Sequence, residues 1–314
     1  MKRTWAAVIF FCLSAFSLMT GLEASVENRT LGGHTFILPS TDTFSHAFVL
    51  TNFGFSQGFR FLKAFSLEAP VRDRERLVID LSMIGVVEKF DLGIAFSDWI
   101  GMNFVTRGTV IVGVDGKSAL LRGGEGRVGF DIGPVIRLLR LNSTQVALRA
   151  DLKWRSGRHV SPLLYVLRSL DLGRPADTRE LFAKTGSLGF QASLSGAQSF
   201  GKSLGLQTNL AYFVFEEDYF QEKTTYKDLH AGMSPSFDLS PLLRFPLALM
   251  LEYQYSRYFK EEENIHTIGG GLYYSGRSDL QLGLFLSTVI FPKSDDFPEG
   301  SNDTYVQIRM NYFF

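Results

Sequence analysis

The chain has 314 residues, of which 45% are apolar and 20% charged, and its 32 basic residues balance 32 acidic ones. The zero net charge argues against a nucleic-acid-binding domain, which carries a basic excess, and the apolar content argues against intrinsic disorder. A single cysteine excludes a disulfide framework and a four-cysteine zinc site. Aromatic residues make up 14% of the chain, yet its mean hydropathy is only +0.06, so the apolar residues must be spread in a regular pattern.

The first 24 residues have the organisation of a secretory signal peptide. Lys2 and Arg3 precede an apolar stretch from Trp5 to Leu18, and Ala24 is an acceptable cleavage position. A helical membrane anchor is the alternative, but the stretch is short and polar chain follows it at once. We therefore predict a signal peptide at 1–24 and an exported mature chain.

Most of the remaining sequence alternates between apolar and polar residues. Between Val146 and Arg155, every second residue is apolar, and the interleaved positions carry charged side chains. This two-residue period is typical of a β-strand with one apolar face. Such segments recur to the end of the chain, and they are longer than the usual strand of about 5–6 residues. They match the about 9–11 tilted residues that cross a hydrocarbon core.

Together with the predicted signal peptide, these strands and the final sequence T-Y-V-Q-I-R-M-N-Y-F-F resemble a Gram-negative outer-membrane β-barrel protein. The resemblance implies that the terminal residues Met310, Tyr312 and Phe314 form the signal read by the barrel-assembly machinery. It also implies periplasmic chaperones as partners during export, outer-membrane lipid around the folded chain, and no nucleic acid partner. The expected location is the bacterial outer membrane.

The predicted fold is all-β: a transmembrane, antiparallel, up-and-down barrel of about 12 strands, with a range of 10–14. Short turns would face the periplasm and long loops the outside. We place the barrel in residues 77–314 and an N-terminal lead or plug in residues 25–76. The twelfth strand is Leu77 to Ile84. If that segment belongs to a plug instead, the twelfth strand is Phe44 to Gly58. The long loop 156–184 contains a short predicted helix from Pro162 to Leu172.

Charged side chains on the polar faces of the strands would line the lumen. They form either a structural ion-pair network or a ring that selects among solutes. The surplus of basic groups favours a mild preference for anions. The candidates are Arg107, Asp131, Arg137, Arg149, Asp151, Lys153, Arg155, Asp228, His230, Glu252 and Arg309. Aromatic residues at the strand ends, including Trp99 and Trp154, would form girdles at the two membrane interfaces.

These features predict a passive channel or small-solute transporter. One alternative is a plugged transporter of hydrophobic compounds, resembling the fatty-acid channel family, which would need residues 25–76 inside the lumen and an apolar patch there. A second is a structural or adhesin-like barrel without an open pore. We expect no enzymatic activity, because no His/Ser/acid set can be assembled, and we expect no metal or other cofactor.

Overall fold

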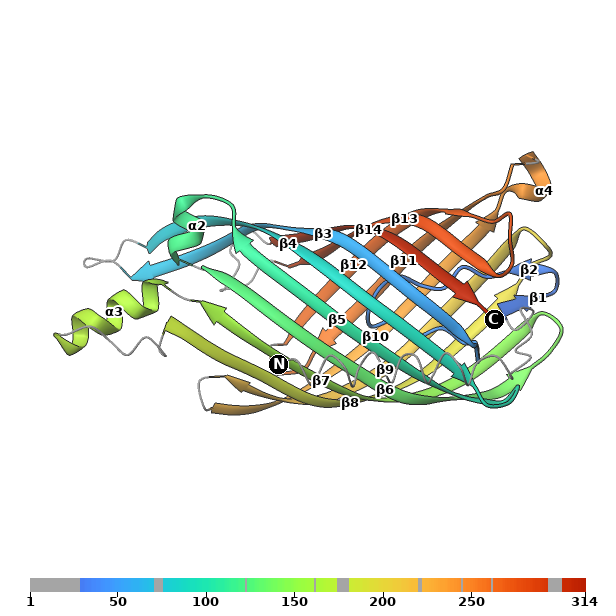
Figure 1. Cartoon of the computed structure of the whole chain (residues 1–314), viewed down its shortest axis with the longest axis horizontal. Helices are drawn as coiled ribbons and strands as arrows, with labels where there is room; N and C mark the ends of the chain where they lie inside the picture. Colours follow the sequence, from blue (N-terminus) through green and yellow to red (C-terminus); the bar gives the residue numbers. More distant parts are fainter. Residues whose placement is uncertain are drawn as a thin grey trace, which may run out of the picture.

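The computed structural model describes residues 29–70, 76–121, 123–160, 162–173, 181–219, 222–243, 245–260, 262–292 and 301–314. The predicted signal peptide lies outside the described residues. Twelve antiparallel strands form one closed barrel, as predicted, in which each strand pairs with its sequence neighbours and β14 pairs with β3. Figure 1 shows the strands strongly tilted to the long axis of the barrel, as closure of a twisted sheet requires.

Several barrel strands are longer than the about 9–11 residues needed to cross a hydrocarbon core, and β3 and β4 have 19 and 20 residues. Their bounds are β3 (Asn52–Pro70), β4 (Arg76–Ala95), β5 (Ile100–Gly113), β6 (Gly124–Arg140), β7 (Thr144–Val160), β8 (Phe182–Ser199), β9 (Leu204–Tyr219), β10 (Glu222–Asp238), β11 (Leu247–Tyr258), β12 (Glu263–Tyr274), β13 (Leu280–Phe291) and β14 (Ser301–Phe313).

Among the described residues, the connections between barrel strands contain three short helices: α2 (Gly116–Leu121), α3 (Pro162–Leu172) and α4 (Ser240–Leu243). The bounds of α3 confirm the helix predicted in the long loop. None of the helices in the described ranges has both the length and the apolar character needed to cross a membrane.

The structure sets the start of the barrel earlier than the sequence analysis did. Residues 77–84 are not a separate strand, because β4 runs without a break from Arg76 to Ala95. The additional strand is β3, which begins at Asn52 and pairs with both β4 and β14. The expected boundary at residue 77 is therefore wrong. Alternation in β3 is hard to read from sequence, because glycines occupy some of its inward positions and phenylalanines most of its outward ones.

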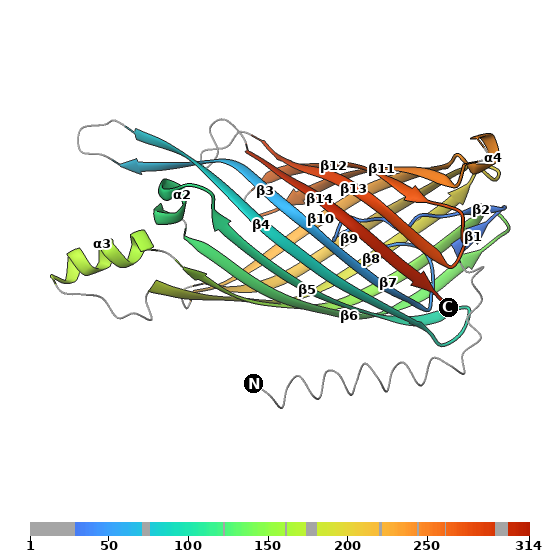
Figure 2. The same ribbon diagram turned by 45° about the horizontal axis from the view of Figure 1, so that its top comes forward.

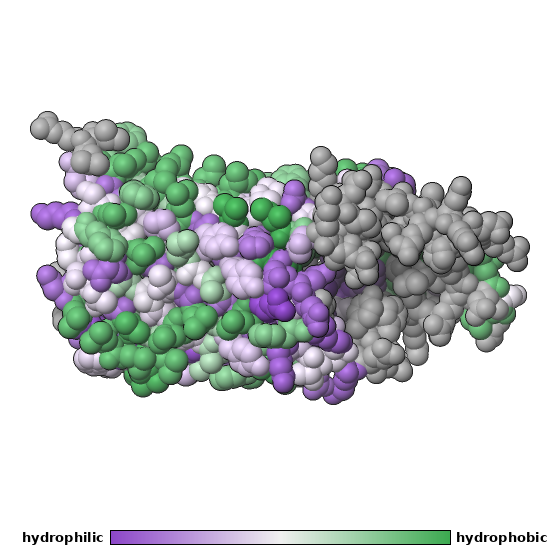
Figure 3. Space-filling model, turned by 180° about the vertical axis from the view of Figure 1, so that it is seen from behind, coloured by the Kyte–Doolittle hydropathy of each residue, from purple (hydrophilic) through white to green (hydrophobic). Residues whose placement is uncertain are grey.

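The apolar faces of the strands form the outer wall. In β13, Leu282, Leu284 and Leu286 are about half exposed, whereas the interleaved Gln281 and Phe285 are 1% exposed. The same alternation runs round the barrel, and Figure 3 shows apolar side chains spread over the described part of one face. Such a wall is stable against hydrocarbon and unfavourable in water.

The two ends of the barrel differ. The short turns and the C-terminus lie at one end, and the long connections, which contain α2 and α3, lie at the other (Figure 2). This arrangement matches the expected periplasmic and outer ends of the class. We use these names for the two ends below.

Residues 29–51, which we call the inner segment, lie within the periplasmic part of the barrel. The segment starts with the hairpin of β1 (Thr30–Leu31) and β2 (His34–Thr35). Its turn contains Gly32 and Gly33, both with positive φ, a conformation that glycine adopts without strain. The chain then runs inward, turns back and returns to the periplasmic end, where β3 begins (Figures 1 and 2). The turn is closed by a hydrogen bond from the Phe44 amide to the Thr41 carbonyl.

We predict that a positive charge on the outer wall destabilises the barrel according to its depth. Leu286→Arg, midway along β13, should lower the free energy of unfolding by about 2–4 kcal/mol, whereas Leu280→Arg, at its periplasmic end, should cost about 0–1 kcal/mol. Denaturant titration of the refolded protein in lipid vesicles measures both values. Equal costs at the two positions would contradict a membrane-facing wall.

Candidate functional site: the barrel lumen

The hairpin of the inner segment lies against three of the short periplasmic turns. The Gly32 amide donates to the Asn142 carbonyl at 2.7 Å, and the Arg29 Nε donates to the Ser278 carbonyl at 3.1 Å. The His34 ring lies between the Lys202 carbonyl and the Ser236 hydroxyl, at 3.1 and 2.9 Å. Since these turns belong to different hairpins around the barrel, β1 and β2 cover much of the periplasmic mouth.

The inward limb is held by long polar side chains of the wall. Gln207 Nε2 donates to the Ile37 carbonyl at 2.7 Å. Gln281 accepts from the Leu38 amide at 2.9 Å, and Arg309 Nη1 donates to the Leu38 carbonyl at 3.2 Å. This limb has no regular partner strand, so wall side chains satisfy backbone groups that would otherwise be buried without hydrogen bonds.

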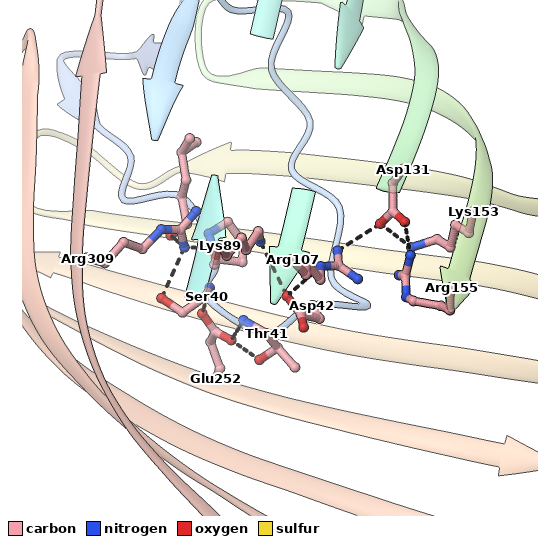
Figure 4. A network of polar contacts seen from close by, with 12 residues as sticks. Ser40, Thr41, Asp42, Lys89, Arg107, Asp131, Lys153, Arg155, Glu252 and Arg309 are labelled. Atoms are coloured by element: carbon pink, nitrogen blue, oxygen red, sulfur yellow. Dashed lines mark hydrogen bonds and ion pairs between the residues drawn. The ribbon is translucent and has the colours of Figure 1, made fainter. Parts of the chain in front are cut away.

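Glu252 on β11 holds the point where the inner segment turns. Its carboxylate accepts hydrogen bonds from the backbone amides of Ser40 and Thr41 and from the Thr41 hydroxyl. The Ser40 hydroxyl also contacts Arg309 at 3.1 Å and the Tyr273 hydroxyl at 2.8 Å. Figure 4 shows Glu252 and Arg309 converging on this turn. A carboxylate that accepts from several donors fixes the turn firmly.

The returning limb is bound in the same way by side chains of β7, β8 and β9. Asn209 donates to the Thr43 carbonyl at 3.3 Å, Ser195 donates to the Ser45 carbonyl at 2.8 Å, and Gln145 donates to the Ala47 carbonyl. Between the two limbs Phe36 and Phe48 pack together, with ring centroids 5.3 Å apart. Both rings are 0% exposed, so the periplasmic part of the lumen is filled at this level.

Glycines in the wall leave room for the inner segment. A Cβ atom added at Gly205 would lie 2.5 Å from Phe36 Cε1 and would also meet the His34 ring. One added at Gly232 would lie 2.9 Å from the Phe44 ring. These separations are far below normal contact distances, so wall and inner segment are complementary in shape at these positions.

On the outer side of the turn, charged side chains replace the packed apolar side chains that fill the lumen on its periplasmic side. Asp42 forms ion pairs with Lys89 on β4, at 3.4 Å, and with Arg107 on β5, at 3.5 Å. The Asp42 side chain is 49% exposed although it lies within the barrel, so it faces solvent-accessible space in the lumen. Enclosure by the barrel wall limits hydration of this exposed carboxylate and would raise the pKa of Asp42, but the charges of Arg107 and Lys89 outweigh this effect and lower the pKa to about 2, which keeps the carboxylate ionised.

Arg107 links this pair to a second carboxylate. Asp131 on β6 lies 2.8 Å from Arg107 and 3.3 Å from Lys153, and it also pairs with Arg155 (Figure 4). Gly129 allows this approach, because a Cβ there would lie 2.6 Å from Cδ of the Arg155 side chain. We call the six side chains Asp42, Lys89, Arg107, Asp131, Lys153 and Arg155 the charged cluster. It contains four cations and two carboxylates.

The structure places every predicted lumen residue on an inward-facing strand position. Four of them belong to the charged cluster, namely Arg107, Asp131, Lys153 and Arg155, and Glu252 binds the turn. Arg309 also contacts the turn. Arg149 and Asp151 form their own pair at 2.8 Å. Arg137, Asp228 and His230 are buried elsewhere along the wall.

The remaining predicted residues lie on the outer wall or at the chain end. Trp99 and Trp154 are about half exposed and point outward, as a girdle residue would. The side chains of Met310 and Tyr312 face outward from β14, and Phe314 follows this strand. Roles in selectivity, membrane anchoring and assembly stay predictions for all of these residues.

Asp42 and Lys89 were not among the residues predicted from the sequence. Neither were the glutamine and asparagine side chains that hold the inner segment. Lys89 sits at an inward position of β4 and could have been found by extending the alternation to that strand. Asp42 lies in a stretch without periodicity, and its partners are distant in sequence. Inward glutamine and asparagine residues were a usable signal, because such side chains are suited to bind irregular backbone.

Comparison with known proteins found similarity in fold alone. No protein-family model matches the chain, and no curated protein matches it in sequence. Among solved structures, an outer-membrane channel from Pseudomonas putida F1 is similar with a TM-score of 0.55 and 11% identity, covering 88% of this chain and 100% of that one. The translocator domain of the autotransporter NalP from Neisseria meningitidis gives 0.51 and 10%, covering 84% and 88%. The transport unit of AIDA-I from Escherichia coli gives 0.51 and 11%, covering 92% and 97%.

The closed antiparallel barrel, its apolar outer wall and these similarities define the class. The chain has the fold of an outer-membrane β-barrel protein.

We predict that filling the space at Gly205 displaces the inner segment. Gly205→Val should clash with His34 and Phe36, while Gly108→Val, on the outer wall with open space around it, should be tolerated. A cysteine introduced by Ser45→Cys, a buried position, reports the change through its rate of reaction with a charged maleimide.

The rate should rise at least about tenfold with Gly205→Val, which corresponds to about 1.4 kcal/mol in the equilibrium between bound and released segment. It should stay unchanged with Gly108→Val. Equal rates in the two variants would contradict the packing described here.

Proposed function

We propose that this protein is a channel in the bacterial outer membrane for small anionic solutes, closed at its periplasmic end by the inner segment. The observation that carries the proposal is the charged cluster. Four cations share two carboxylates there, so the cluster itself carries two more positive than negative charges. Rings of basic side chains favour anions in pores.

Solvent reaches this cluster from the lumen. Asp42 is 49% exposed and Arg155 is 27% exposed, although both lie within the barrel. A purely structural barrel has no need of solvent-accessible charges on its inner surface. The accessible charge therefore favours solute passage over a structural barrel.

The plugged transporter of hydrophobic compounds has less support. The inner segment does lie in the lumen, as that alternative requires, but its apolar side chains Phe36, Phe48 and Val49 are 0% exposed. They pack against the wall and against one another and offer no free apolar surface. The accessible groups beyond the turn include the charged cluster, which suits a polar or ionic solute better.

Passage requires the inner segment to move, because no space is left around it at the level of Phe36 and Phe48. The inner segment is held in the lumen by side-chain hydrogen bonds and by packing, which can break and form again. Its regular strand pairing is the short hairpin between β1 and β2, which lies within the segment itself. Segments held in this way can open locally without unfolding the barrel.

We predict that removing the inner segment opens the channel. The refolded mature protein should show low conductance in planar bilayers, and deletion of residues 29–48, which leaves β3 intact, should raise it several-fold. Gly205→Val should give an intermediate increase, with Gly108→Val as the control. Absence of conductance in the deletion variant would rule out a channel.

We also predict that the charged cluster sets ion preference. In a KCl gradient, the deletion variant should show a zero-current potential of the sign expected for chloride preference. Arg155→Gln should reduce the permeability ratio by at most about fivefold, because a unit charge about 4 Å away is worth about 1 kcal/mol in water. Arg158→Gln, on the outward face of the same strand, is the matched control. Preference for potassium would contradict the proposal.

A further inference from the structure

Three aromatic rings form a continuous stack on the inner wall. Phe213 and Phe215 on β9 have ring centroids 4.8 Å apart with planes inclined by 23°. Phe215 and Tyr226 on β10 have centroids 4.9 Å apart with planes inclined by 14°. All three side chains occupy inward strand positions and are partly exposed, so the stack borders the lumen.

A glycine in the neighbouring strand accommodates the stack. Gly189 on β8 pairs with Phe215 on one side and with Lys153 on the other. A Cβ atom at Gly189 would lie 2.6 Å from Cβ of Phe215 and 2.9 Å from the Phe213 ring. The rings therefore lie over bare backbone, and no side chain of β8 at this position separates them from Lys153.

Each end of the stack carries an ammonium group. The Lys260 nitrogen lies 4.7 Å from the centroid of Tyr226, and the Lys153 nitrogen lies 5.8 Å from that of Phe213. Both distances are within the range of cation–π attraction. Lys260 belongs to the connection between β11 and β12 at the outer end, so the stack starts at an exposed residue.

The inner end of the stack leads into the charged cluster. From the outer connection to the inner segment, the contacts follow one path: Lys260, Tyr226, Phe215, Phe213, Lys153, Asp131, Arg107 and Asp42. Asp228 pairs with Phe213 across β9 and β10, which places one buried carboxylate on the periplasmic side of the stack. The cluster cations Lys153 and Arg155 are on β7, which is separated from the stack by β8.

The cluster already binds carboxylates of the chain itself. Asp131 is held by three cations and Asp42 by two, so its capacity for this group is visible in the structure. Arg155 keeps 27% of its side chain exposed while it pairs with Asp131. A guanidinium carries five N–H donors, which allows it to bind a second carboxylate.

We propose that this part of the wall binds a small organic anion with a flat ring, of the aromatic carboxylate class. The ligand's ring would pack against the lumen-facing edges of Phe213, Phe215 and Tyr226, whose faces are already taken by one another and by the two ammonium groups. Its carboxylate would be received by Arg155, next to Lys153, which is already bound to Asp131. Strands β7 and β9 are two strand spacings apart, about 10 Å, which suits a single ring with an attached carboxylate. The inference rests on the proposed function, since a site in the lumen requires solutes to enter it.

Calorimetry on the full mature protein, refolded in detergent, tests the site without relying on conductance. Benzoate has both recognition elements, acetate lacks the ring and benzyl alcohol lacks the charge. We expect benzoate to bind at least about tenfold more tightly than either. Equal affinity for benzoate and acetate would overturn the role of the rings, and equal affinity for benzoate and benzyl alcohol would overturn that of the cations.

Matched variants locate the binding on the inner wall. Phe215→Leu should weaken benzoate about tenfold and leave acetate unchanged, whereas Phe190→Leu, which replaces an outward-facing ring on β8, should change neither. Arg155→Gln should weaken both anions. An equal loss of benzoate in the two phenylalanine variants would indicate uptake at the detergent-covered surface and would overturn the proposal.

Heat-dependent gel mobility checks that each variant forms a barrel, and Tyr226→Leu provides a second test of the stack if Phe215→Leu does not fold. The proposal and the proposed function fail separately. Benzoate binding without conductance in the deletion variant would support the binding site and contradict the channel. Conductance without ring-dependent binding would support the channel and contradict the binding site.

Discussion

The structure depends on the need to pair every backbone amide and carbonyl, both in lipid and inside the lumen. On the lipid side, closure through β14 and β3 leaves no strand edge unpaired. On the lumen side, the inner segment is irregular and cannot pair with itself beyond one short hairpin. Wall side chains such as Gln207, Gln281 and Glu252 take over that task. The polar inner face is therefore a binding surface for backbone as well as a lining for solutes.

The lumen divides into two chemical zones along its axis. Around Phe36 and Phe48 it is packed like a protein core, and hydrogen bonds to backbone hold the segment in register. From Asp42 outward, charges dominate and solvent enters. Asp42 belongs to the inner segment, and it forms ion pairs with two cations of the wall, Lys89 and Arg107. It therefore couples the packed zone to the charged zone, and the state of one zone should affect the other.

Sequence reasoning could identify the class and strand number of this fold because the two-residue period encodes which face meets lipid. It also assigned residues such as Arg107 and Glu252 to the inner face, since orientation follows from alternation alone. It failed where that period is lost. The inner segment has no repeating pattern, and its contacts join residues as far apart as Leu38 and Gln281, a separation of 243 positions. β3 was misassigned because glycine replaces polar residues at several inward positions.

The inner segment enters and leaves the barrel at the same end. Its first described residue contacts the Ser278 turn, and Thr51 at its last position accepts from the Phe314 amide, so both limbs meet the periplasmic rim. Within the described residues, no segment passes through the cylinder from one opening to the other. In topological terms the segment is an unthreaded loop, so it can be inserted after the cylinder has closed. It can also be withdrawn without breaking any pairing between the strands of the barrel. Assembly of the wall and filling of its interior are thus separable events.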